Sequence, residues 1–349
     1  MTRQLVRYMA LSAAFVVSLP FVVSHSALAS RGSLSYPSQT LAKSDRRAKL
    51  DPKLLGVPPA PQPITGKARS YSSASREIGY DLRTKAVKIV SLPRVRTTLR
   101  QAIEPSSPGF DTADQQEPRI RRNSQSALDT HNRVLITRTT ASPWRVLTKL
   151  YMTFPNGQMY SCSGTLIAAQ YVLTAGHCIY RPDEGGWAKK VEAIPGLNET
   201  YKPYGSAFST KIRTFVAWTS AQDANYDIAL VTLDRAIGNT TGWLGYGHFS
   251  ALNGVTGNLA GYPSDQGGVN LYYHAGPLSK ATPQQLHYPI EAYSGQSGSG
   301  IYRIYTPSGG TRGRYVLGVH SATNGDSNIG TRIDAYKFNA LESWISSGS

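Results

Sequence analysis

The chain has 349 residues, of which 40% are hydrophobic and 17% are charged, and its formal net charge is +16 at pH 7. The charge is unevenly placed: residues 1–125 hold 20 Lys and Arg against 8 Asp and Glu, whereas residues 126–349 hold 17 against 13. A basic segment beside a nearly balanced globular region is not the footprint of a nucleic-acid-binding surface, so nucleic acid is excluded as a partner.

Residues 1–29 have the order of a secretory signal peptide. Two arginines precede the almost wholly apolar stretch 8–23, and a small-x-small cleavage site ends at Ala29. The alternative is a membrane anchor, but an anchor usually needs about twenty unbroken apolar residues, and this run is shorter and contains Pro20. No other stretch is long and apolar enough to span a bilayer. We therefore predict a secreted protein with no membrane association after the signal is removed.

Residues 30–125 are rich in Ser, Pro, Arg and Lys and are predicted to form a removable pro-region. Part of it can fold, because residues 86–92 alternate apolar and polar side chains. The basic run Arg-Ile-Arg-Arg at 119–122 is a candidate processing site, and a solvated charge cluster is the alternative. We expect the mature N-terminus to lie between Arg122 and Val134.

Residues 126–349 have the sequence pattern of an all-β domain. Short runs rich in β-branched and aromatic residues are separated by Gly, Pro, Asn and Ser, which is typical of a sandwich or barrel. The expected strands include residues 146–153, 164–167, 171–174, 228–233, 301–305 and 315–320. Residues 337–346 are the exception, because Phe338, Leu341, Trp344 and Ile345 have helical spacing. The domain is therefore predicted to end in one amphipathic helix.

The only two cysteines are Cys162 and Cys178. Outside the cytosol an even pair usually forms a disulfide. Free buried thiols and a metal site are the alternatives, although zinc usually takes about four ligands. We predict a disulfide and no metal.

Two motifs place a histidine and an aspartate beside strands. His177 lies in the sequence Leu-Thr-Ala-Gly-His-Cys, where small residues leave space around the imidazole at the end of a strand. Asp227 stands at the mouth of an apolar strand, and a partly buried carboxylate there needs a donor such as an imidazole N–H. A structural histidine and a turn-capping aspartate are the alternatives.

The third motif is Ser-Gly-Gln-Ser-Gly-Ser-Gly at residues 294–300, with Ser297 at its centre. A serine flanked by glycines can hold its hydroxyl clear of a turn, and we expect the N–H groups of Gly295 and Ser297 to form an oxyanion hole. Such strings are often plain flexible loops. The strand-like segments on both sides and the two upstream motifs favour a nucleophile. An α/β-hydrolase would run Ser, acid, His, whereas this chain runs His177, Asp227, Ser297.

Together these motifs resemble the glutamyl endopeptidases, a bacterial branch of the chymotrypsin-fold serine proteases. Shared strings also occur at residues 203–206, 237–240, 261–263 and 318–320, and the resemblance covers about 126–347. It implies two perpendicular six-stranded antiparallel β-barrels, at about 130–245 and 246–335, followed by a helix at about 336–347. The active site would lie in the cleft between the barrels. The same resemblance favours removal of the pro-region by a cut near Gln125 and Ser126.

The resemblance also implies a serine endopeptidase in which Asp227 orients His177, and His177 takes the proton from Ser297. We expect protein or peptide substrates, a monomer, and no metal or organic cofactor.

Family members prefer Glu on the acyl side of the cut bond and recognise it with a histidine and with a hydroxyl residue five positions before the nucleophile. His320 occupies the first position, but Ala292 occupies the second and has no hydroxyl, so Ser321 and Thr323 are candidate substitutes. A preference for Glu or Asp is expected. The alternatives are another primary specificity and a non-catalytic binding or toxin-like module.

Overall fold

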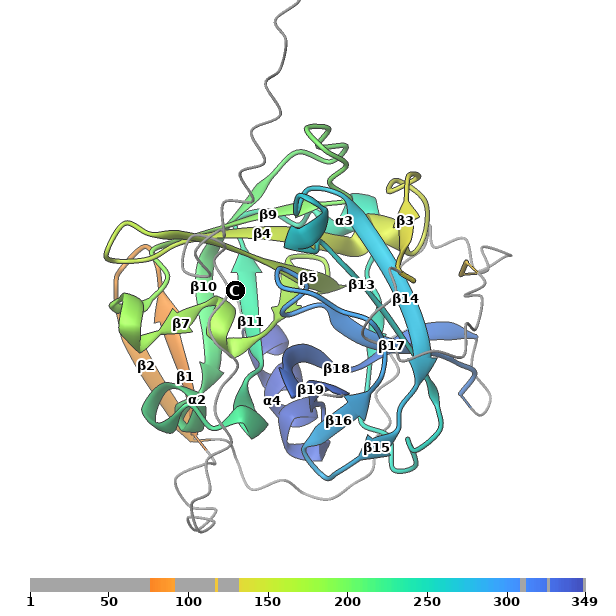
Figure 1. Cartoon of the computed structure of the whole chain (residues 1–349). Coiled ribbons are helices and arrows are strands. Elements are labelled where there is room, and N and C mark those ends of the chain that lie inside the picture. The colour runs from red at the N-terminus through yellow and green to blue at the C-terminus, as the bar shows by residue number, and fades with distance from the viewer. Residues whose placement is uncertain (1–75, 92–116, 119–131, 308–311, 325–326, 348–349) are drawn as a thin grey trace, which may run out of the picture. The chain divides into compact units, whose positions relative to one another are not determined.

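The computed structural model describes residues 76–91, 117–118, 132–307, 312–324 and 327–347, all within the compact unit Lys49–Ser349 (Figure 1). The predicted signal peptide, most of the predicted pro-region and the proposed processing segment lie outside the described residues. None of the helices in the described residues is long and apolar enough to cross a bilayer.

The first sheet contains a closed barrel, as predicted for an all-β protease fold. Its strands are β1 (Arg76–Asp81), β2 (Val87–Ser91), β4 (Leu147–Thr153), β5 (Met159–Ala168), β6 (Tyr171–Thr174), β9 (Lys190–Pro195), β10 (Ala207–Phe215) and β11 (Ala229–Leu233). Their order is β11-β6-β5-β4-β9-β10-β1-β2, and β11 also pairs with β10, so the six strands from β11 to β10 form the barrel. The hairpin β1–β2 extends this sheet and comes from the predicted pro-region.

The second sheet has nine strands. They are β3 (Val134–Ile136), β12 (Gly245–Tyr246), β13 (Thr256–Gly261), β14 (Leu271–Pro277), β15 (Lys280–Ala281), β16 (Gln285–Tyr288), β17 (Gly300–Tyr305), β18 (Gly313–Asn324) and β19 (Ser327–Arg332). The order is β15-β16-β19-β18-β17-β13-β14-β3, and β12 pairs with β18. β3 falls in the range predicted for the first barrel but pairs with β14, because the chain passes along the second sheet before it enters β4.

Short elements connect these strands. They are β7 (Tyr180–Arg181), β8 (Gly186–Trp187), α2 (Val216–Ala221), α3 (Gly238–Thr241), and the 3-10 turns Trp144–Val146, Gly176–Cys178, Pro182–Glu184, Ala224–Tyr226 and Ser264–Gln266.

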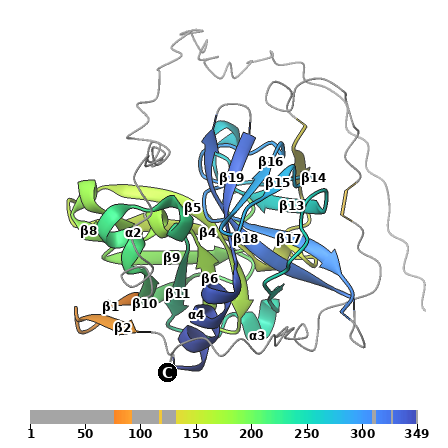
Figure 2. The same cartoon turned by 90° about the horizontal axis from the view of Figure 1, so that it is seen from below.

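The C-terminal helix α4 (Ala335–Ser346) covers one side of the first barrel (Figure 2). Its first turn is capped by Asp334, whose carboxylate accepts a hydrogen bond from the N–H of Lys337. Phe338, Leu341 and Trp344 are buried, which confirms the predicted apolar face, and Trp344 packs on Phe215 of β10 with ring centroids 5.2 Å apart. Burial on both sides explains why β11 is apolar at nearly every position.

Candidate active site

His177 stands in the 3-10 turn Gly176–Cys178 that follows β6. A Cβ added at Gly176 would lie 2.9 Å from the ring of Trp218, so the turn can pack against this ring only with glycine at that position. The predicted disulfide is present: Cys178 is bonded to Cys162 of β5, with their Cα atoms 6.2 Å apart. Packing and the cross-link together hold His177 in place, with 5% of its surface exposed.

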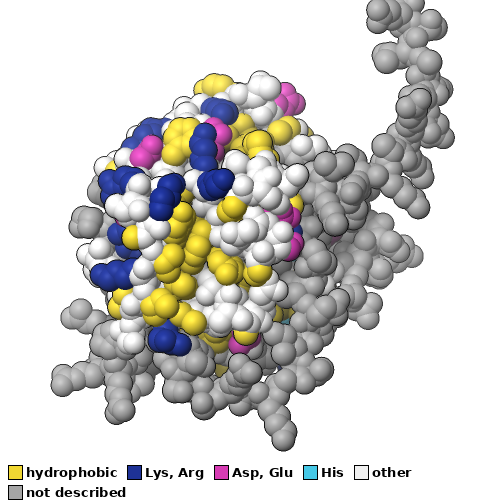
Figure 3. Space-filling model, turned by 90° about the vertical axis from the view of Figure 1, so that its left-hand side faces the viewer, with side chains coloured by type: hydrophobic (Ala, Val, Ile, Leu, Met, Phe, Trp, Pro, Cys, Tyr) yellow, Lys and Arg dark blue, Asp and Glu magenta, His cyan; other side chains and the backbone are white. Residues whose placement is uncertain are grey.

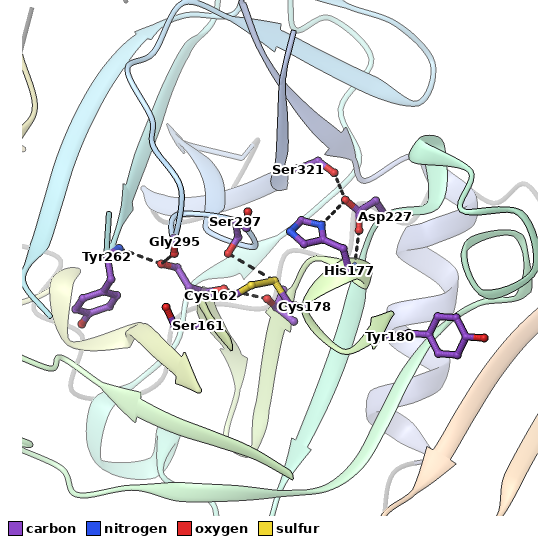
Figure 4. The surroundings of a disulfide bond; sticks show 12 residues. Ser161, Cys162, His177, Cys178, Tyr180, Asp227, Tyr262, Gly295, Ser297 and Ser321 are labelled. Atoms are coloured by element: carbon purple, nitrogen blue, oxygen red, sulfur yellow. Dashed lines mark hydrogen bonds and ion pairs between the residues drawn. A yellow bond between two sulfur atoms is a disulfide. The ribbon is translucent and has the colours of Figure 1, made fainter. Parts of the chain in front are cut away.

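Asp227 lies two residues before the start of β11 and is fully buried. Its carboxylate accepts hydrogen bonds from the backbone N–H of His177 at 2.8 Å, from Nδ1 of His177 at 2.7 Å, and from the hydroxyl of Ser321 (Figure 4). A carboxylate can only accept, so Nδ1 of His177 carries a proton. In a neutral imidazole Nε2 then has a lone pair and can accept a proton.

Ser297 lies on a loop between β16 and β17 that is tied to the first barrel. Ser163 of β5 donates its N–H to the carbonyl of Ser297 and its hydroxyl to the carbonyl of Gly295, both at 2.8 Å. Gly295 and Gly298 have φ angles of +90° and +81°, and added Cβ atoms would lie 2.5 Å from the carbonyl of Tyr262 and 2.1 Å from the hydroxyl of Thr174. Only glycine combines this backbone conformation with such close approaches.

Within residues 295–299 of this loop, two backbone N–H groups differ from the other three. Those of Gln296, Gly298 and Ser299 donate to carbonyl oxygens at 2.8–3.0 Å. In contrast, the N–H groups of Gly295 and Ser297, and the Ser297 hydroxyl, form no hydrogen bond with any residue that the structure describes. Two neighbouring free donors beside a hydroxyl can stabilise a negative charge that develops on a carbonyl oxygen.

His320 of β18 is buried, and its Nδ1 lies 2.7 Å from the hydroxyl of Tyr288. Burial, with a smaller contribution from the nearby His177, lowers the pKa of His320 to about 4, although Asp227 opposes part of this shift, so the ring is neutral at pH 7. Burial also raises the pKa of Tyr288 far above its usual value. Tyr288 is therefore the donor to Nδ1, and the single ring proton of His320 sits on Nε2.

The other three residues predicted to contact the substrate are not arranged like His320. The hydroxyl of Ser321 donates to Asp227, so it supports the acid rather than a pocket. Thr323 is exposed and donates to the side chain of Asn328 at 2.6 Å. Ala292 is half-buried and packs against the apolar cluster of the second sheet.

A buried ion cluster next to the loop that carries Ser297 is not evident from the sequence. Arg133 donates to Glu291 at 2.9 Å, to Asp265 at 3.0 Å and to the side-chain oxygen of Gln296 at 3.5 Å. The same oxygen of Gln296 accepts from the N–H of Tyr293 at 2.9 Å. Because Gln296 precedes Ser297, this cluster joins Arg133, near the start of the described segment 132–307, to the loop that carries Ser297. Its members are more than 130 residues from Arg133, so no local pattern could reveal it.

Within the described residues, one group has metal-ligand geometry: Cys162, His177 and Cys178 offer atoms within 4.8 Å of one another. The two sulfur atoms are bonded to each other, so neither is a thiolate ligand.

Comparison with known proteins gives consistent results. A family model described as Trypsin matches residues 136–345. The chain is 35% identical to the glutamyl endopeptidase of Bacillus licheniformis over 229 residues, covering 64% of this chain and 70% of that protein. It is 34% identical to the extracellular metalloprotease of Bacillus subtilis over 222 residues, covering 63% and 69%. A solved Glu endopeptidase in complex with MPD has a TM-score of 0.54 and 28% identity, and covers 62% of this chain and 98% of its own.

The trypsin model spans more than half of the chain and includes His177, Asp227 and Ser297. The solved Glu endopeptidase matches over nearly its whole length, which agrees with the β-rich fold. The resemblance inferred from the sequence is thereby confirmed. This chain belongs to the trypsin family, and it is a serine endopeptidase similar to the glutamyl endopeptidases.

Proposed function

We propose that this endopeptidase cleaves peptide bonds with Ser297 as nucleophile, His177 as general base and Asp227 as the residue that orients the base. The observation that carries this proposal is the pairing of His177 with a fully buried Asp227 at 2.7 Å. It is joined by the loop of Ser297, in which the N–H groups of Gly295 and Ser297 form no hydrogen bond with any described residue. Buried charges are tolerated when they are fully hydrogen-bonded, and Asp227 has three donors.

The mechanism follows from these roles. Nε2 of His177 accepts the proton of Ser297 while the serine oxygen attacks the scissile carbonyl. The N–H groups of Gly295 and Ser297 donate to the oxyanion. His177 then gives the proton to the leaving amine, and a water molecule hydrolyses the acyl-enzyme by the same route. Asp227 fixes the tautomer of the base and stabilises the imidazolium that forms.

The specificity that we propose is for Glu, with Asp as a poorer substrate. His320 supports it, because its Nε2–H is a donor with no partner among the described residues. The likeness to proteins named for glutamyl specificity supports it further. The absence of a hydroxyl at Ala292 favours a second candidate, a chymotrypsin-fold protease with another primary specificity.

We also propose that the protein is secreted and that its active form lacks the pro-region. The disulfide supports an oxidising compartment, and a related protein of Bacillus subtilis is described as extracellular. The segments that carry the signal and the processing site lie outside the described residues.

The test of the catalytic proposal is Ser297→Ala, with Ser299→Ala as the matched control from the same loop. We expect Ser297→Ala to abolish peptide cleavage and labelling by a serine-directed sulfonyl fluoride, while Ser299→Ala retains both. Intact-mass analysis of the labelled enzyme identifies the modified residue. Full cleavage by pure Ser297→Ala protein would overturn the mechanism.

A further inference from the structure

The β1–β2 hairpin comes from the predicted pro-region but forms part of the first sheet. β1 pairs with β10 in antiparallel register from Glu77 opposite Phe215 to Asp81 opposite Lys211. The neighbouring strand β9 pairs only with the first two residues of β10, Ala207 and Phe208. β1 therefore forms backbone hydrogen bonds with the part of the β10 edge that β9 does not cover, as in recognition by addition of a β-strand.

The hairpin also carries a buried carboxylate into the protease domain. Glu77 is 6% exposed and accepts a hydrogen bond from Nε1 of Trp344 in α4. Arg213 of β10 is the charged group beside it, and Arg213 donates to the carbonyl of Trp344 at 3.2 Å. Among the described residues, Tyr336 of α4 is a further titratable group that interacts with Glu77. One side chain of the hairpin thus meets both the barrel edge and the C-terminal helix.

Two further contacts hold the hairpin. The ring of Tyr80 stacks on Trp187 of β8 with centroids 5.8 Å apart and planes 15° from parallel. Leu82 is buried and donates its N–H to the carbonyl of Thr210 at 2.9 Å.

The outer strand β2, by contrast, is exposed along its whole length, including Val87 and Ile89. Hydrophobic side chains gather among Lys and Arg on the face of the molecule on which the hairpin lies (Figure 3). The contacts of the hairpin are therefore concentrated in β1 and the turn that follows it.

We propose that the hairpin Arg76–Ser91 is the element by which the pro-region binds the protease domain, and that it stays on the β10 edge after the chain is cut until rising pH releases it. The proposal rests on the proposed removal of the pro-region, since only a cut chain can lose the hairpin. The partner is a β-hairpin of this chain, recognised by backbone pairing and one buried carboxyl group.

The pH dependence follows from the burial of Glu77. Burial raises its pKa to about 7 against a usual value of 4.5, while the hydrogen bond from Trp344 and the charge of Arg213 offset only part of this shift. The docked hairpin thus binds a proton more tightly than the free hairpin. Docking is strongest below about pH 4.5 and weakens as pH rises through 7. The linkage predicts a dissociation constant about ten- to a hundredfold higher at pH 8 than at pH 5.

The experiment uses the full chain with Ser297→Ala, which removes self-cleavage, and with a recognition sequence for a specific protease in place of residues 119–125. After the cut, size-exclusion chromatography and intact-mass analysis follow the pro-region fragment at pH 5 and pH 8. We expect co-elution at pH 5 and release at pH 8. Glu77→Gln, which cannot ionise, should co-elute at both values.

Asp81→Asn is the matched control, because Asp81 lies on the same strand and its hydrogen bonds from the N–H groups of Arg83 and Thr84 can be kept by an amide oxygen. It should show the same release as the parent. Release at both pH values would overturn the docking role, and equal affinity at both would overturn the pH dependence. Since the readout is binding in an inactive background, it is independent of whether Ser297 is the nucleophile.

Discussion

His320 shows how burial sets the chemistry of one side chain. A histidine opposite a substrate carboxylate is most effective when charged, yet this ring is neutral above about pH 4 and receives a hydrogen bond from Tyr288. The proposed contact is therefore a neutral N–H donor to a charged acceptor. A hydrogen bond to a charged group contributes about 1.5–3 kcal/mol, which is about ten- to a hundredfold in rate.

We predict that His320→Ala lowers kcat/KM for Glu substrates about ten- to a hundredfold and for uncharged substrates much less. Ala292→Thr, which introduces a hydroxyl at the position where the family has one, should increase the preference for Glu. Kinetics on matched peptides with Glu, Asp, Lys and Phe measure both effects. Equal losses on acidic and neutral peptides would make His320 a structural residue.

Single residues were predictable where chemistry is local. The strings around His177 and Ser297 combine a reactive side chain with the small residues that its turn requires, and the structure places the two on elements joined by Ser163. The place of Ser321 next to His320 in the sequence makes it a candidate for the pocket. Its hydroxyl instead donates to Asp227, which is 94 residues away in the sequence, so only the fold reveals this contact.

Among the elements, the apolar pattern of a strand such as β6 predicts it from the sequence, whereas a mostly polar strand such as β19 gives little signal. β6 has the predicted bounds, and α4 begins two residues before the predicted helical run. β19 has the sequence Ser-Asn-Ile-Gly-Thr-Arg, in which a Cβ added at Gly330 would lie 2.9 Å from the backbone carbonyl oxygen of Val319. Its pairing with β18 depends on tertiary fit rather than on intrinsic strand preference.

The loop that carries Ser297 depends on the Arg133 cluster. Arg133→Ala leaves Glu291 and Asp265 without their shared cation and removes a donor to Gln296. We predict a fall in kcat of at least tenfold with a smaller change in KM, because the oxyanion donors are displaced more than the substrate site.

Steady-state kinetics with a thermal unfolding curve separate this effect from global destabilisation. Arg235→Ala is the control, because Arg235 is exposed and donates to two carbonyls elsewhere in the first barrel. An unchanged kcat in folded Arg133→Ala protein would contradict a positioning role.

Over the whole molecule, the proposed catalytic residues lie where the two sheets are tied together. His177 and Asp227 lie next to strands of the first sheet, and Ser297 lies on a loop between two strands of the second sheet, to which His320 also belongs. Ser163 of the first sheet donates two hydrogen bonds to that loop. The family resemblance predicted this two-part architecture. It could not predict the docked hairpin, because the pairing of β1 with β10 joins residues more than 100 positions apart.

The stability of the whole molecule should depend on pH through Lys149 of β4. Its side chain is 1% exposed, donates to the hydroxyl of Ser161 at 2.9 Å, and forms no ion pair with the described residues. Burial lowers its pKa from 10.5 to about 7. The unfolded chain therefore binds more protons than the folded chain between pH 7 and 10.5, so the free energy of unfolding rises with pH in this window.

Replacing this lysine should remove that dependence. Lys149→Met keeps the length of the side chain without the charge, and we predict a gain in stability at pH 6 of up to about 5 kcal/mol and a flatter profile towards pH 10. Urea unfolding from pH 6 to 10 measures the free energy of unfolding, and the Ser297→Ala background prevents autolysis. Lys202→Met, at an exposed lysine paired with Glu192, should leave the slope unchanged. If Lys149→Met is less stable than its parent at pH 6, the buried amine stabilises the fold, and the predicted destabilisation by Lys149 is wrong.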